Sequence, residues 1–198
     1  KYYNDPRSQW LEQYYTQASN ISWTWPYFQK LMYHNFSLPN IVKPSLPLNW
    51  FSDKTGLSEH RSSWDSNATL CWMYNAPTKK AGHEHRDNNT FSIFRKKSQI
   101  INSGYYDSYG SPHYINYYMR TIAKNGICIF DSTEQYTNWG VNVSNDGGQI
   151  ESPTLMNYSD IISPGAKKGL WILWGMDTNY CYQVADGSLS YDSSKVQS

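Results

Sequence analysis

The stretch from Gly82 to Lys97, GHEHRDNNTFSIFRKK, is the most informative part of this sequence. Within it the residues from Thr90 to Arg95 alternate, with Phe91 and Ile93 on one side of a pleat. The letters DNN just before them are typical of a turn. The stretch therefore predicts a β-strand that follows a turn, and two histidines stand directly before that turn.

Short runs of the same character recur through the rest of the chain. Turn clusters such as NSG, YGSP and NDGG separate them, and this pattern is typical of antiparallel sheets packed as a sandwich. We therefore expect a mainly β fold, an antiparallel β-sandwich. The further strands are expected at Thr69–Tyr74, Gln99–Asn102, Tyr114–Met119, Gly126–Phe130 and Leu170–Trp174.

The N-terminal part of the sequence has a different pattern. Asp5 and Pro6 resemble an N-cap followed by a proline in the first helical position, which predicts a helix over residues 6–18. A second short helix is expected over residues 25–35. Residues 36–49 contain three prolines and no clear period, so they predict an extended linker.

The composition excludes several classes of protein. The net charge of +1 argues against a nucleic-acid partner, and no apolar run is long enough to span a membrane. Aromatic residues make up 17% of the chain, with 9 Trp and 18 Tyr, which is common in proteins that handle carbohydrate but also in β-rich cores. The three cysteines have no CxxC spacing, so we expect buried free thiols.

The segment His83-Glu84-His85 raises a question about ligand binding. If it is extended, both imidazoles lie on one face and Glu84 lies on the other. The two histidines could then meet one ligand, or one could bind a metal while the other meets substrate. An exposed polar turn explains the same three residues, and both interpretations stay open at this point.

The segment from Asn102 to Gly126 concentrates tyrosines in a short span. It reads NSGYYDSYGSPHYINYYMRTIAKNG and includes Tyr105 and His113. One interpretation is an exposed β-hairpin. The other is a wall of aromatic rings that faces a sugar.

Six motifs occur in the same order as in the heparinase II/III-like polysaccharide lyases, and the chain resembles that family over about residues 50–192. The order of the six motifs makes this resemblance far more specific than any one of them. The motifs are RSSW at 61–64, GHEHRDNNTFSIF at 82–94, NSGYYD at 102–107, RTIAKNGICIFD at 120–131, NDGGQ at 145–149 and ADGSLSY at 185–191.

The resemblance implies a domain organisation. Members of that family have an α/α toroid followed by β-sandwich domains, with the active site between them. Residues 1–36 would then be the terminal helices of the toroid, residues 37–49 a linker, and residues 50–198 a partial β-sandwich. On this basis we expect the chain to be a fragment that is inactive by itself.

The resemblance also implies a function, the cleavage of uronate-containing polysaccharide such as heparin or heparan sulfate by β-elimination. His83 matches the family histidine that faces the substrate, and we expect it to be catalytic. Substrate binding is expected at Arg86, Tyr105 and His113. The alternative is a non-catalytic carbohydrate-binding or structural β-sandwich.

The metal positions of the family are changed in this sequence. His85 matches a metal ligand, but Asn102 and Lys124 stand where the other two ligands are Asp and His. An amide is a poor zinc ligand, and an ammonium has no lone pair. Either Lys124 places its charge where the ion would be and pairs with nearby carboxylates such as Asp87 or Asp107, or a shifted site uses Asp107 or His113. We expect no cofactor or a structural zinc, with the metal-free form favoured.

The remaining expectations concern partners and location. The resemblance implies an acidic polysaccharide as the partner. The charge and the apolar runs predict no nucleic acid and no membrane span, and a homo-oligomer stays an open alternative. It also implies a bacterial protein that is periplasmic or secreted.

Overall fold

The computed structural model describes residues 47–78, 83–138, 141–143, 145–150, 159, 162, 166, 168–177 and 180–196. The chain divides into two compact units, residues 1–47 and 48–198, and every element described below belongs to the second. The helices expected at 6–18 and 25–35 lie outside the described residues. The assignment of toroid, linker and sandwich therefore stays a prediction.

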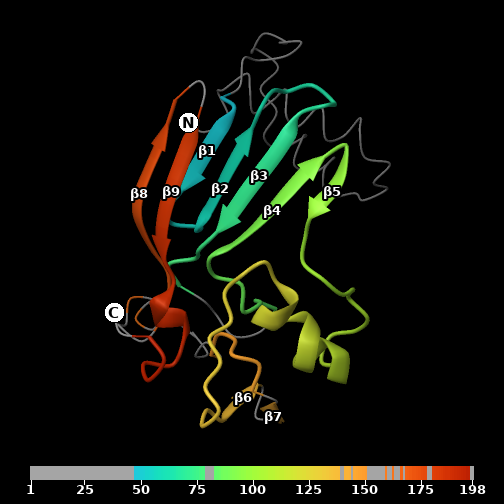
Figure 1. Ribbon diagram of the computed structural model, residues 1–198, viewed down its shortest axis with the longest axis vertical. Coiled ribbons are helices and arrows are strands. Elements are labelled where there is room, and N and C mark those ends of the chain that lie inside the picture. The colour runs from blue at the N-terminus through green and yellow to red at the C-terminus, as the bar shows by residue number, and fades with distance from the viewer. Residues whose placement is uncertain are drawn as a thin grey trace, which may run out of the picture. The chain divides into compact units, whose positions relative to one another are not determined.

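The largest element is a five-stranded antiparallel sheet whose strands lie in sequence order (Figure 1). Neighbouring strands are joined by short connections, except that a longer segment links the third and fourth. A bulge interrupts the last pairing between Ile93 and Phe94. The strands are β1 (Asn49–Ser52), β2 (Leu57–Arg61), β3 (Thr69–Tyr74), β4 (Thr90–Arg95) and β5 (Lys97–Ile100).

A two-stranded hairpin packs against one face of this sheet. The hairpin consists of β8 (Leu170–Met176) and β9 (Cys181–Asp186). Phe51 of β1 stacks on Trp174 with ring centroids 4.7 Å apart. Ser58 of β2 donates to Gln183 Oε1 of β9 at 2.7 Å. Because Phe51 and Ser58 are paired across β1 and β2, they share the face that the hairpin covers.

The expectation of a mainly β, antiparallel fold is confirmed. The strands at Thr69–Tyr74 and Thr90–Arg95 have the expected bounds, and the strand at Leu170 continues to Met176. The strand expected from Gln99 begins earlier, at Lys97. Thr90–Arg95 shows an alternation of burial along its first residues, whereas Thr69–Tyr74 is half-buried throughout.

Two of the expected strands are wrong. Tyr114–Tyr118 forms a π-helical segment (η1), and residues 126–130 have no regular structure. Ser111 explains the helix, because its hydroxyl accepts from the Tyr114 amide at 2.9 Å and its carbonyl from the Ile115 amide at 2.9 Å. Pro112 occupies the first helical position, where its missing N–H costs nothing.

Short elements complete the described part of the chain. They are the 3-10 turns η2 (Thr121–Ala123) and η4 (Ser188–Ser190) and the strands β6 (Tyr136–Asn138) and β7 (Val141–Val143). In Figure 1 the segment from β5 through η1 lies beyond the end of the sheet where β3 ends and β4 begins.

The contacts at this end of the sheet are largely polar. Asn88 is fully buried, and its side-chain oxygen accepts from the Ala76 amide at 3.0 Å. The Gln149 side chain accepts from the Asn88 amide at 3.0 Å and donates to the Asn88 carbonyl at 2.8 Å. These reciprocal bonds satisfy buried groups that would otherwise be costly. They fix the backbone that follows the His83–Asp87 segment.

Two expectations from composition can be compared with the structure. No helix in the described part of the chain is long and apolar enough to cross a membrane. The three cysteines are free, as expected, but the expectation that they are buried is wrong: Cys128 and Cys181 are exposed and Cys71 is half-buried. The spacing of cysteines in the sequence does not determine whether they are exposed. Their exposure depends on the strands and loops in which they lie.

Candidate functional site

The segment with the two histidines lies against the segment around η1. The Arg86 amide donates to the Met119 carbonyl at 2.8 Å, and the Thr121 hydroxyl donates to the Arg86 carbonyl at 2.8 Å. The Ser103 amide donates to the Ala123 carbonyl at 2.8 Å. Three stretches distant in sequence therefore meet at one end of the sheet.

Their side chains form a continuous group of rings, which we call the aromatic–histidine cluster. Each ring in it lies within 6.4 Å of at least one other, centroid to centroid. The cluster consists of His83, His85, Tyr105, Tyr106, Tyr109, His113, Tyr114, Tyr117 and Tyr118.

His83 lies at an exposed edge of the cluster. Its imidazole stacks on Tyr109 with centroids 4.2 Å apart and an interplanar angle of 26°. Tyr109 is exposed, and it packs in turn on buried Tyr114 at 5.3 Å. His83 is thus oriented by a ring while it stays accessible, which is the condition for a group that meets substrate.

His113 and Tyr105 form a second exposed stack. Their centroids are 5.2 Å apart, and His113 Nε2 lies 3.2 Å from the Tyr105 carbonyl oxygen. The Tyr105 ring is 69% exposed. The Ser111 hydroxyl lies 2.7 Å from both Asp107 carboxylate oxygens, and its hydrogen bond holds the pKa of that carboxyl below its usual range. The Asp107 carboxylate therefore supports the turn that carries these rings.

Gly104 permits the close approach of two rings in this turn. Its φ is +80°, and a Cβ there would lie 3.0 Å from the Tyr117 ring. The neighbouring Ser103 hydroxyl lies 2.7 Å from the Tyr117 hydroxyl. A side chain at position 104 would meet both a steric and a conformational obstacle.

His85 lies deeper in the cluster and contacts Lys124. Lys124 Nζ is 2.7 Å from His85 Nδ1 and 4.9 Å from the centroid of the Tyr118 ring. An ammonium can only donate, so His85 Nδ1 is the acceptor and its ring proton is on Nε2. The Lys124 residue is only 8% exposed.

The three family metal positions do not have the chemistry of a zinc site. The lone pair of His85 Nδ1 already accepts from Lys124, and a protonated lysine cannot ligate a cation. Asn102 Oδ1 is buried and accepts no hydrogen bond from the described residues. Among those residues no group of three or more His, Cys, Asp or Glu side chains is arranged to hold a metal ion.

Arg86 is placed differently from the other predicted site residues. It is only 5% exposed, and its Nη1 lies 3.4 Å from the Glu84 carbonyl oxygen. The expectation that Arg86 binds substrate stays a prediction.

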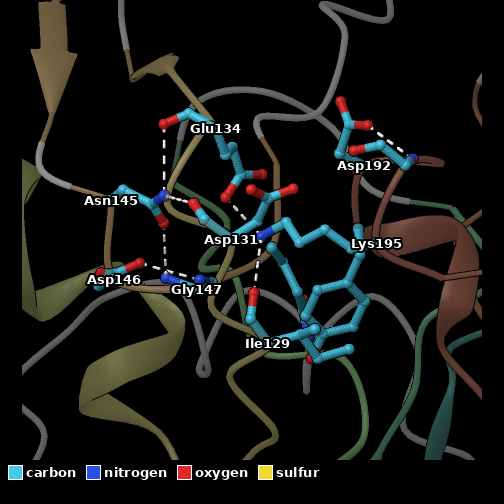
Figure 2. A network of polar contacts seen from close by, with 12 residues as sticks. Ile129, Asp131, Glu134, Asn145, Asp146, Gly147, Asp192 and Lys195 are labelled. Carbon is cyan, nitrogen blue, oxygen red and sulfur yellow. Dashed lines mark hydrogen bonds and ion pairs between the residues drawn. The ribbon is translucent and has the colours of Figure 1, made fainter.

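A second set of polar contacts supports the loops beside the cluster. Arg120 forms a two-pronged ion pair with Asp146, through Nε at 2.7 Å and Nη2 at 2.6 Å. Figure 2 shows the neighbouring network, in which Lys195 Nζ lies 2.5 Å from Glu134 Oε2 and 3.0 Å from the Ile129 carbonyl oxygen. These contacts join the motif NDGGQ and the C-terminal turn to residues 120–134.

Sequence reasoning missed two features of this site. It did not identify Tyr109 as the partner of His83, or the direct contact of Lys124 with His85. The density of tyrosines between positions 105 and 118 indicated a wall of rings, but the pairing depends on the turn at Gly110 and on η1.

Two comparisons with known proteins gave matches. The family model described as "Heparinase II/III-like, C-terminal" matches residues 43–167. The chain is also similar to the crystal structure of heparan sulfate lyase HepC from Pedobacter heparinus, at 20% identity and a TM-score of 0.39. That match covers 68% of this chain and 21% of HepC, so the chain spans about a fifth of that protein's length.

A comparison with curated proteins gave no match. The family match covers more than half of the residues, and it includes the whole aromatic–histidine cluster together with Asn102 and Lys124. The chain belongs to the heparinase II/III-like family.

Proposed function

We propose that the protein carrying this chain is a polysaccharide lyase that cleaves uronate-containing polysaccharide by β-elimination. The observation that carries the proposal is the exposed His83, stacked on Tyr109 at the edge of a cluster of rings. Family membership supports it, since the family is named for heparinases. Heparan sulfate is the substrate of the HepC protein, and we propose the same class of acidic polysaccharide here.

The reaction needs a base close to C5 of the uronate. In our proposal neutral His83 accepts the C5 proton, and the electrons of that bond form a double bond between C4 and C5. The bond from C4 to the glycosidic oxygen then breaks, and this oxygen leaves after it gains a proton. The charge that develops on the uronate carboxylate must be stabilised by hydrogen-bond donors or cations.

The exposed rings provide a surface for the sugar. Tyr105, Tyr106 and Tyr109 each present more than two fifths of their surface to solvent. A tyrosine ring combines a flat apolar face, which suits the C–H face of a pyranose, with a hydroxyl that can form hydrogen bonds. Stacking on these rings would hold a uronate beside His83. We further propose that the protein acts in the periplasm or outside the cell, where such polymers occur.

A second function is favoured by the contact between Lys124 and His85. A scaffold that has exchanged its metal ligands could retain the rings and bind sugar without cleaving it. This candidate is a non-catalytic carbohydrate-binding β-sandwich. It predicts binding of uronate oligosaccharides and no turnover.

One experiment separates the two functions. The full protein is incubated with heparan sulfate, with other glycosaminoglycans and with alginate, and the release of product that absorbs in the ultraviolet is followed. Binding of the same polymers is measured by titration calorimetry. Unsaturated product supports the lyase. Binding without product would replace it by the carbohydrate-binding function, and neither binding nor product would contradict both.

A further inference from the structure

The side chain of Lys124 occupies an unusual position for a lysine. It is almost fully buried, and its ammonium contacts His85 Nδ1 at 2.7 Å and the face of the Tyr118 ring at 4.9 Å. The His85 ring itself meets Tyr118 edge-on, with centroids 5.1 Å apart and an interplanar angle of 79°. The three groups contact one another in pairs, so the ammonium is held from two sides.

Both contacts favour a charged ammonium over a neutral side chain. Burial of an ammonium is costly unless hydrogen bonds and nearby π-electrons replace the lost water. The imidazole nitrogen provides an acceptor, and the Tyr118 ring provides the negative face of its quadrupole. A neutral side chain of the same length would lose both interactions.

The backbone of Lys124 is fixed as well. Its amide donates to the Thr121 carbonyl at 2.9 Å at the end of η2, and the Asn125 side chain donates to the Phe91 carbonyl at 3.0 Å. The Lys124 side chain therefore extends from a turn whose backbone is held by hydrogen bonds. It joins His85 to a position 39 residues further along the sequence.

We propose that the Lys124 ammonium is a built-in cation that replaces a metal ion in this family member. The ammonium contacts both His85 and Tyr118 of η1, so it connects these two segments. A metal ion with ligands from both segments would connect them in the same way. His83 lies two residues from His85 and stacks on Tyr109, so the same connection positions the proposed base. Lys124 is thus a positioning residue. The proposal concerns folding and metal content, so it stands or falls independently of lyase activity.

The first test measures the metal content of the chain. The purified protein is equilibrated with zinc chloride, separated from free zinc by gel filtration, and analysed by inductively coupled plasma mass spectrometry. We expect less than about one zinc ion per ten chains, and no change in Tm when EDTA is added, because the Nδ1 lone pair is already used. One zinc ion per chain, or a Tm that falls with EDTA, would overturn the proposal.

The second test removes the ammonium while keeping the stem of the side chain. Lys124→Met should lower Tm by about 5 °C or more, because His85 Nδ1 loses its hydrogen-bond donor and the Tyr118 ring loses its cation. Lys54→Met is the matched control, since the Lys54 side chain is 87% exposed and forms an ion pair with exposed Asp53. A Tm of Lys124→Met equal to that of the control would contradict a role for the ammonium.

A third test asks whether the replacement can be reversed. The double variant Asn102→Asp, Lys124→His restores a carboxylate and an imidazole at the two changed family positions, and with His85 these are three residues of the types that bind zinc. Zinc chloride should raise its Tm and leave that of the unchanged protein unaffected. If zinc fails to raise the Tm of the folded double variant, Lys124 does not stand where an ion would bind.

Discussion

At the scale of single residues, His83 and His85 have different environments although one residue separates them. His83 is exposed and is oriented by a stacked ring, whereas His85 accepts from a buried ammonium and contacts two tyrosines edge-on. A side chain that meets substrate needs the first environment, and one that supports the site needs the second. The two histidines should therefore respond differently to substitution.

Replacing His83 by alanine should remove activity and leave the fold intact. Loss of a general base reduces turnover by about 10²- to 10⁴-fold, while truncation of an exposed imidazole changes stability little. Initial rates of ultraviolet-absorbing product and thermal unfolding measure the two effects. Phe130→Ala is the control, because Phe130 is also exposed but lies outside the cluster. Turnover of His83→Ala at the level of this control would contradict the assignment.

At the scale of secondary-structure elements, the packing of the hairpin β8–β9 on the sheet depends on few polar contacts. Gln183 of β9 accepts from Ser58 of β2 through Oε1, and its Nε2 contacts His60 Nε2. His60 Nδ1 lies 3.0 Å from Asn49 Oδ1. Since Gln183 Nε2 can only donate, His60 must be neutral with its proton on Nδ1. If His60 were protonated on Nε2 as well, that N–H would point at the Gln183 Nε2 donor.

Acid should weaken this layer packing through His60. Burial lowers the pKa of His60 below its ordinary value, with a smaller opposing effect of Glu59. The unfolded state then binds more protons than the folded state, so stability is present above pH ~6.5 and is lost as the pH falls below it. Unfolding in urea between pH 7.5 and pH 5 measures how the free energy of unfolding depends on pH. This range extends above and below the ordinary histidine pKa of about 6.5.

The variant His60→Gln isolates this effect. Glutamine can donate to Asn49 and accept from Gln183 but does not titrate. Its stability should depend less on pH between these limits than that of the unchanged protein. Equal pH dependence of the two would show that His60 does not report on the packing.

The turn between β1 and β2 is a second test at this scale. Gly56 has φ +71°, and a Cβ there would lie 2.3 Å from the Ala76 Cα and 2.5 Å from the Asn75 carbonyl oxygen. Because these are backbone atoms, Gly56→Ala should cost more than about 3 kcal/mol. In the control Gly126→Ala, the nearest atom is the Thr90 methyl at 3.1 Å, and the loss should be smaller. Equal losses in chemical denaturation would contradict this account of the turn.

At the scale of the folded unit from 48 to 198, the C-terminal turn is joined to the loop before β6 by a buried ion pair (Figure 2). The side chains of Lys195 and Glu134 are 1% and 6% exposed. The two charges lie close together, although neither Glu134 oxygen accepts a hydrogen bond with good geometry. Lys195 also donates to the Ile129 carbonyl.

Lys195→Met should destabilise this unit by about 3–5 kcal/mol, because it leaves a buried carboxylate without a counter-charge. The double variant Glu134→Gln, Lys195→Met should recover part of that loss, since no buried charge then remains. Urea denaturation of both variants measures the difference. A Lys195→Met stability within about 0.5 kcal/mol of the unchanged protein would show that the pair does not hold the C-terminal turn.

The sequence allowed prediction of the features that depend on local pattern. Short apolar and aromatic runs bounded by turn residues located Thr69–Tyr74 and Thr90–Arg95, because such runs favour strands whatever the rest of the fold. The same reasoning failed at Tyr114–Tyr118, where aromatic and β-branched residues favour strands but Ser111 and Pro112 start a helix. Ser111 and Pro112 were a helix-start signal in the sequence, but the strand preference of the residues after them was given more weight.

The candidate site depends on contacts that no local pattern contains. The motifs identified the segments that meet, but the contact of Lys124 with His85 joins residues far apart in sequence. Whether a basic residue pairs with a carboxylate, a histidine or a ring is decided by the turn that presents it. Charge and spacing alone left both a metal-free and a shifted metal site possible.

The mass balance of a single cleavage tests the proposed reaction most directly. A uronate-containing oligosaccharide of defined length is incubated with the full protein, and the two products are weighed by mass spectrometry. Elimination adds no water, so the product masses should sum to that of the substrate, and the new non-reducing end should absorb in the ultraviolet. Products whose masses sum to the substrate plus one water would show hydrolysis and contradict the lyase assignment.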